Sequence, residues 1–229
     1  MQKTGIQTPV QDKNYVPPLD AILVIIVTFF LTILISATFI FLLPDVSVVL
    51  VVGEVLTAAP PLAYLVYKRV DMKNYFGAYP KPKFILMGLV LGFGLLLLGI
   101  LVSGMVILVF GESEAVAKAN EQLLELSQTP HGLAAAIATC LLAGICEELA
   151  FRGFLQNSIR GKYSAKTALL ISSVAFALFH FDPQGAYIAT SFIMGLVLGY
   201  IYNRWHSYIA NATAHAVYDL LALAILLAL

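Results

Sequence analysis

Charged residues are scarce in this chain of 229 residues: Asp, Glu, Lys and Arg together make up 11%, against about 25% in an average soluble domain. This scarcity of charge excludes a nucleic-acid binder with a basic face. Thirteen basic and thirteen acidic residues cancel, so the net charge indicates no partner. The only two cysteines, Cys140 and Cys146, form no CxxC motif. We expect both to be buried and to pack as small hydrophobic side chains. Hydrophobic residues make up 60% instead and the mean hydropathy is +0.90, which indicates a polytopic membrane protein.

The apolar residues form seven runs, which predict an all-α polytopic membrane helix bundle with about seven transmembrane helices. The runs cover residues 20–43, 46–67, 84–110, 131–160, 166–181, 184–203 and 208–229. We interpret residues 1–229 as one integral membrane domain with a polar N-terminal tail at 1–19. The run 166–181 is barely long enough to cross a bilayer, so we expect it to end at a protein-lined cavity. Glycines in the run 84–110 favour close helix packing.

Basic residues gather on one side of the predicted bundle. If the N-terminus is cytoplasmic, alternation of the spans places eleven of the thirteen Lys and Arg inside and Lys118 alone outside, while Arg152 lies within a helix. The acidic segment 111–130, with a short amphipathic surface helix, then lies outside. Lys and Arg set the orientation of membrane proteins, so we expect a cytoplasmic N-terminus and an external C-terminus. The compact chain favours a prokaryotic plasma membrane.

Ionisable residues inside the membrane are costly unless they are paired or hydrated, so each one needs an explanation. They concentrate in the second half of the chain, at Glu147, Glu148, Arg152, His180, His215 and Asp219, and the polar Asn211 lies among them. Glu148 and Arg152 are four residues apart, so they share a helix face and can pair. Glu147 points about 100° away and has no local cation, which suits a general base. For Glu54, in the second run, we expect a structural hydrogen bond to another helix.

Three short motifs in this half resemble those of a known family. They are Glu147-Glu148-x-x-x-Arg152, Phe176-x-x-x-His180 and His215-x-x-x-Asp219. In this order they match EExxxR, FxxxH and Hxxx(N/D) of the CAAX-protease and bacteriocin-processing (Abi) intramembrane endopeptidases, which include the Ras-converting CAAX endopeptidases. The resemblance predicts a catalytic core at 133–220. Many CAAX-processing members have Asn at the position of Asp219.

The resemblance implies that a peptide bond is hydrolysed in a conical active-site cavity within the membrane. Carried over by motif, Glu147 and His180 activate water, while His215 and Asp219 lie on the oxyanion side. Because a carboxylate is a poor oxyanion donor unless it is protonated, we expect Asp219 to orient His215.

The remaining motif residues have a supporting role in this picture. Glu148, Arg152 and Phe176 hold the helices and bind substrate. The implied partners are a membrane-associated protein or peptide, of which a prenylated CAAX peptide is one candidate, and the lipid bilayer. No nucleic acid is expected.

Other mechanisms and functions stay open. We expect no cofactor, because no HExxH motif ties two metal ligands to one helix; the alternative is a zinc site of Glu147, His180 and His215 with water as the fourth ligand. Intramembrane Glu, His and Asp also build transporters, although the two halves show no inverted repeat. A bacteriocin-immunity or other scaffold membrane protein is the non-enzymatic alternative.

Overall fold

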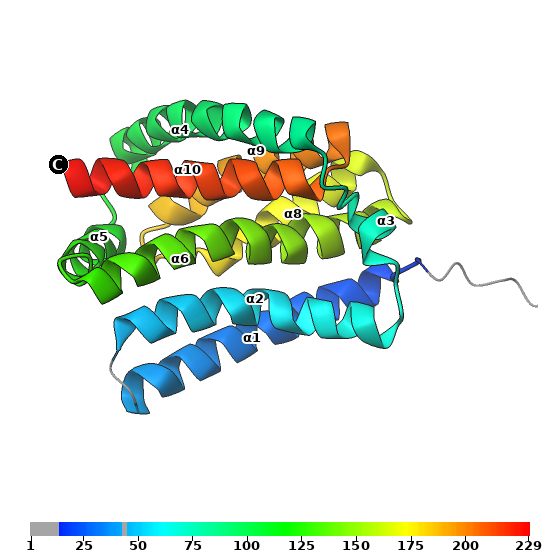
Figure 1. Cartoon of the computed structure of the whole chain (residues 1–229), viewed down its shortest axis with the longest axis horizontal. Coiled ribbons are helices and arrows are strands. Elements are labelled where there is room, and N and C mark those ends of the chain that lie inside the picture. Colours follow the sequence, from blue (N-terminus) through cyan, green and yellow to red (C-terminus); the bar gives the residue numbers. More distant parts are fainter. Residues whose placement is uncertain (1–13, 43–44) are drawn as a thin grey trace, which may run out of the picture.

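Seven apolar helices form the body of the protein in a computed structural model that describes residues 14–42 and 45–229; the rest of the predicted tail at 1–19 lies outside these residues. Within the described residues there is no strand. The seven are α1 (Pro18–Leu42), α2 (Val46–Tyr67), α4 (Pro82–Phe110), a continuous helix of α6 (Pro130–Glu147), η1 (Glu148–Gln156) and α7 (Asn157–Arg160), α8 (Ala165–Phe179), α9 (Ala186–Trp205) and α10 (Tyr208–Ala228) (Figure 1).

Six of these helices are long and apolar enough to cross a membrane, and α8 is a shorter apolar helix. The predicted all-α membrane bundle is confirmed, and the predicted count of about seven is close. At about 1.5 Å per residue, the 15 residues of α8 extend about 22 Å, less than the roughly 30 Å of a bilayer core. The helix therefore ends part-way along the bundle, at His180.

Two short helices mark the opposite ends of the bundle. Figure 1 shows α3 (Met72–Phe76) at one end, with the connections from α7 to α8 and from α9 to α10, and α5 (Glu114–Leu126) at the other. The basic loops and the acidic segment 111–130 are therefore on opposite sides, as alternating spans require. A cytoplasmic N-terminus stays a prediction.

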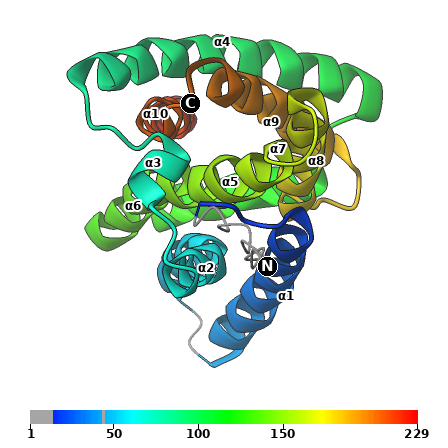
Figure 2. The same cartoon turned by 90° about the vertical axis from the view of Figure 1, so that its right-hand side faces the viewer.

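Helix α10 lies between α4 and α6, and glycines allow both to approach it closely (Figure 2). A Cβ on Gly92 of α4 would lie 2.6 Å from Cβ of Val217 and 2.9 Å from the carbonyl oxygen of Ala214. On the α6 side, a Cβ on Gly144 would lie 2.6 Å from the carbonyl oxygen of Ala212. Small residues of this kind are the usual means of close helix contact in membranes.

The segment η1 is a π-helix that the sequence did not predict. All of its side chains except that of Leu149 are buried. Two of them make hydrogen bonds to α9: Nη2 of Arg152 donates to the carbonyl oxygen of Gly195 at 3.3 Å, and Nε2 of Gln156 donates to that of Gly199 at 2.8 Å. The π-helical stretch thus presents a polar row to a neighbouring helix, and π-helical turns often occur at functional sites.

We expect Gly92→Ala to destabilise the protein and Gly94→Ala to leave it nearly unchanged. The added methyl group at Gly92 overlaps α10, and overpacking commonly costs about 1–3 kcal/mol. At Gly94, two residues along the same helix, nothing lies within 4 Å of the added atom. The measurement is the thermal unfolding midpoint in detergent, and equal midpoints for the two variants would contradict the close α4–α10 contact.

Candidate active site

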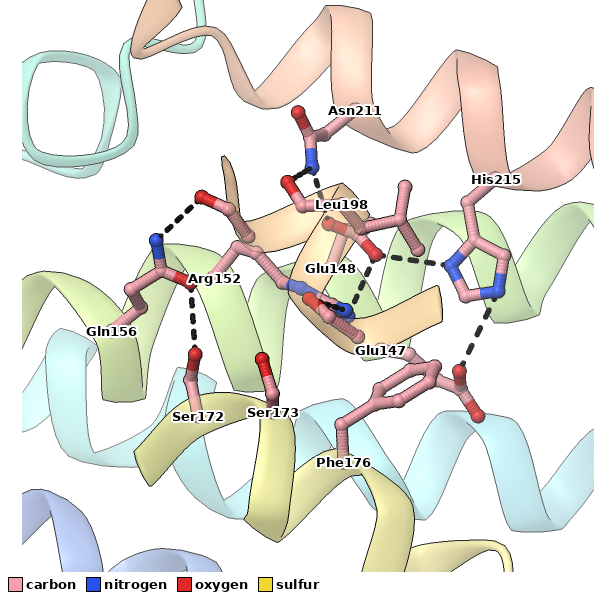
Figure 3. Close-up of polar contacts among 12 residues, drawn as sticks. Glu147, Glu148, Arg152, Gln156, Ser172, Ser173, Phe176, Leu198, Asn211 and His215 are labelled. Atoms are coloured by element: carbon pink, nitrogen blue, oxygen red, sulfur yellow. Dashed lines mark hydrogen bonds and ion pairs between the residues drawn. The ribbon is translucent and has the colours of Figure 1, made fainter. Parts of the chain in front are cut away.

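The carboxylate of Glu148 is the centre of a buried hydrogen-bond network between η1 and α10 (Figure 3). Its Oε1 lies 2.8 Å from Nη1 of Arg152 and 3.0 Å from Nδ1 of His215. Its Oε2 accepts a hydrogen bond of 2.9 Å from Nδ2 of Asn211. The Glu148 side chain is 0% exposed, so these three donors replace water as its partners.

Arg152 is held by groups on two further helices. Besides its bond to α9, its guanidinium lies 4.2 Å from the centre of the Phe176 ring on α8, in cation–π contact. The predicted pair of Glu148 and Arg152 is therefore present. These two residues and Phe176 are all buried and lie outside the lining of the cavity around Glu147. Their predicted role in binding substrate stays a prediction.

Glu147 points to a different place from Glu148, towards two imidazole rings. Its Oε1 lies 3.9 Å from Nε2 of His180, and its Oε2 lies 3.7 Å from Nε2 of His215. Both distances are longer than a hydrogen bond, so a water molecule could bridge each pair. Nε2 of His215 also lies 3.5 Å from Oδ2 of Asp219. The four side chains predicted as catalytic thus lie around one point.

Both imidazoles are fixed by a partner behind the ring. Nδ1 of His180 lies 2.8 Å from the carbonyl oxygen of Phe176, and a carbonyl can only accept, so Nδ1 carries the proton. Nδ1 of His215 faces the carboxylate of Glu148 in the same way. A neutral imidazole with its proton on Nδ1 has a lone pair on Nε2. In both rings this second nitrogen faces Glu147.

The loop after α8 brings the chain back to the site. Asp182 accepts hydrogen bonds from the backbone N–H groups of Gly185 and, at 2.8 Å, Tyr187. Burial raises the pKa of Asp182, but these hydrogen bonds outweigh it and hold the pKa below its ordinary value. The ring of Tyr187 then packs edge-on against His180, with centroids 5.1 Å apart. The loop therefore places an aromatic side chain directly beside the site.

The four side chains line one cavity of about 570 Å³. It extends towards α5 and the C-terminal end of α10, which lie at the same end of the bundle in Figure 1. Its other polar lining residues are Glu54, Ser103, Asn120, Thr139, Cys140, Tyr187 and Tyr218. Ligand pockets commonly have volumes of about 300–1,000 Å³, so the space suits a short peptide segment.

The side chains of the alternative zinc site lie somewhat farther apart than the ligand atoms of one zinc ion, and the site stays an alternative. Zinc lies about 2.0–2.2 Å from N and O ligands, which puts two ligand atoms of a tetrahedral site about 3.3 Å apart. The distances from Glu147 to the two imidazoles, 3.9 and 3.7 Å, are longer. In residues 14–42 and 45–229, no three His, Cys, Asp or Glu side chains are grouped so that they could hold a metal ion.

Three residues differ from what the sequence led us to expect. The sequence indicated no role for Asn211, although it precedes His215 by four residues and so shares its helix face. In the structure it donates a hydrogen bond to Glu148. Cys140 lines the cavity, whereas Cys146 is buried as expected. The structural hydrogen bond expected for Glu54 is wrong for Oε2, which is buried and has no hydrogen-bond partner in the described part of the chain.

The comparisons with known proteins agree with the motifs. Residues 129–221 match the family model of the type II CAAX prenyl endopeptidase, Rce1-like, and this segment includes the predicted core at 133–220. The resemblance predicted from the three motifs is confirmed. The match names a protease and supports neither the transporter nor the scaffold alternative. No curated protein and no solved structure matches the chain.

We expect Glu148→Gln to lower stability and cleavage together. The change leaves Arg152 without its counter-ion, and breaking a buried pair from one side costs roughly 3–5 kcal/mol. The double variant with Arg152→Met should recover part of the stability but not the activity, because His215 still lacks a carboxylate at Nδ1. Thermal unfolding and peptide cleavage are measured in detergent, with exposed Glu121→Gln as the control. If Glu148→Gln were as stable as the wild type, the hydrogen-bond network around Glu148 would not stabilise the fold as proposed.

Proposed function

We propose, from the Rce1-like match of residues 129–221, that the protein is an intramembrane endopeptidase that hydrolyses a peptide bond of a membrane-associated protein or peptide. One observation of the structure supports this more than any other. Glu147, His180 and His215 come from three separate helices, yet they meet at one cavity inside the bundle. The sequence motifs alone do not require this convergence.

In the proposed reaction, Glu147 and His180 activate the attacking water. The water lies between Oε1 of Glu147 and Nε2 of His180, two acceptors that can each take one of its hydrogens. As the water oxygen forms its bond to the scissile carbonyl carbon, Glu147 takes the proton. Glu147 then gives this proton to the leaving nitrogen as the C–N bond breaks. General acid–base catalysis of this kind contributes typically about 10²–10⁴-fold.

His215 is the proposed donor to the oxyanion. Its Nδ1–H is held by Glu148, so a protonated ring presents a second N–H, at Nε2, to the cavity. Asp219, 3.5 Å from this nitrogen, stabilises the protonated ring and orients it. A fixed donor aimed at the place where negative charge develops is among the strongest contributions to catalysis.

The substrate reaches the site from within or beside the bilayer. Large apolar side chains cover the outer surfaces of α1 and α4, so a lipid-anchored segment can approach the bundle laterally. A prenylated CAAX peptide is one candidate. We further propose that the protein lies in a prokaryotic plasma membrane with a cytoplasmic N-terminus, which puts the α5 end of the cavity outside.

We expect Glu147→Gln to remain folded and to cleave about 10²–10⁴-fold more slowly, because an amide cannot take the proton from water. Its thermal midpoint should stay close to that of the wild type, since Glu147 lies outside the Glu148 network. Cleavage of candidate membrane-anchored peptides is measured with Glu121→Gln as the matched change at an exposed site. A Glu147→Gln variant that cleaves at the wild-type rate would remove the proposed base.

We also expect cleavage to survive thorough chelation, because the proposed steps use only side chains and water. Purified protein is treated with a strong chelator, and zinc content and cleavage rate are measured on the same sample. About one zinc per chain, lost together with activity and restored with it, would instead favour the site of Glu147, His180 and His215.

A further inference from the structure

Acidic groups outnumber basic ones around the cavity. Three carboxyl side chains line it: Glu54, Glu147 and Asp219. His180 and His215 are the imidazoles in the lining, and no Lys or Arg of the described residues lines it. Arg152, which is nearby in sequence, is turned away into the network of Glu148. Three carboxyl groups and two imidazoles therefore face the cavity.

Two of these carboxylates have an oxygen without a partner. Oε2 of Glu147 and Oε2 of Glu54 are buried and accept no hydrogen bond from any described residue, and Glu147 is only 9% exposed. A buried polar atom left unpaired is costly, and such atoms are rare in native proteins. Both side chains line the same cavity, so a donor brought by a ligand would complete them.

Glu54 lines the same cavity as the motif residues Glu147, His180, His215 and Asp219 and belongs to none of the motifs. It comes from α2, which packs against α6. The Rce1-like match begins at residue 129, so the matched segment does not include Glu54. It is therefore a group that the first half of the chain contributes to the site.

The approach to the cavity carries the same sign. Val116, Asn120 and Leu123 of α5 line it, and the segment 111–130 contains Glu112, Glu114, Glu121 and Glu125 against Lys118. Clefts lined by one sign of charge attract ligands of the opposite sign and repel ligands of the same sign. The acidic segment 111–130 at the approach and the carboxyl groups in the cavity lining would therefore both favour a peptide with basic groups.

We propose that Glu54 binds the substrate, and that the cavity accepts a peptide segment with a basic side chain or an amide near the cleaved bond and disfavours a free terminal carboxylate. This inference rests on the proposed endopeptidase function and narrows its substrate class. A CAAX sequence ends at its fourth residue, so its terminal carboxylate lies within three residues of the cysteine. Such a carboxylate would enter a site that already holds three carboxyl groups.

The test uses three fluorescent, acyl-anchored peptides that differ only at the C-terminal end: a free carboxylate, an amide, and an amide preceded by Lys. Cleavage by the wild-type protein is measured in detergent as kcat and KM. Binding is measured separately by fluorescence anisotropy with His180→Ala, which keeps all three carboxyl groups. We expect the order Lys-amide, amide, carboxylate in both, with the difference mainly in KM.

Three variants test whether the preference among the peptides depends on Glu54. Glu54→Gln should reduce the preference for the Lys-amide over the carboxylate peptide by about tenfold, equivalent to roughly 1.4 kcal/mol. Glu54→Asp should restore part of it, which a merely structural role would not predict. Asp71→Asn removes an exposed carboxylate at the N-cap of α3, at the end of the bundle away from α5 (Figure 1), and should leave the preference within about twofold.

The possible results separate the two proposals. If the peptides bind in the expected order but none is cleaved, the endopeptidase function fails and the binding inference stands. If peptides are cleaved and the free carboxylate is preferred, or if Glu54→Gln leaves the size of the preference for the Lys-amide unchanged, the inference is overturned and the endopeptidase function stands.

Discussion

The buried carboxylate of Glu148 constrains the rest of the site. A charge in the membrane interior is tolerated only when it is paired and its oxygens are hydrogen-bonded. Glu148 meets both conditions through Arg152 on its own helix and through Asn211 and His215 on α10. These donors reach it only if η1 and α10 lie side by side. The position of α10 and the orientation of the His215 ring therefore follow from one carboxylate.

Small residues make this arrangement possible. Gly144 of α6 lets the backbone of α10 approach at the turn before the glutamates, and Gly92 of α4 does the same from the opposite side. On α9, Gly195 and Gly199 leave their carbonyl oxygens open to Arg152 and Gln156. Lipid supplies little hydrophobic force between helices, so close packing and buried hydrogen bonds must hold the bundle together. The segment 144–156 supplies both, through the close contact at Gly144 and the hydrogen bonds of Arg152 and Gln156.

Local spacing explains what the sequence could predict. The lengths of the apolar runs predicted the spans, and the separation of four residues predicted the pair of Glu148 and Arg152. The π-helical form of η1 was not predicted, and the hydrogen bonds of its side chains to α9 involve a helix that comes later in the chain, so local spacing does not indicate them. The place of Glu54 at the cavity could not be predicted either, since it depends on how α2 rotates against α6.

Adjacent glutamates differ here because of their surroundings. Successive helical residues point in different directions, so Glu148 meets three donors while Oε2 of Glu147 meets none of the described ones at hydrogen-bond distance. A carboxylate with all its partners holds geometry, because taking up a proton would break bonds that position other groups. A carboxylate with an unpaired oxygen beside a cavity can exchange a proton or accept a ligand's donor. Glu54 is in this second situation although no motif marks it. The number of donors around each carboxylate, which the sequence does not record, therefore decides which acidic residues can act on a substrate.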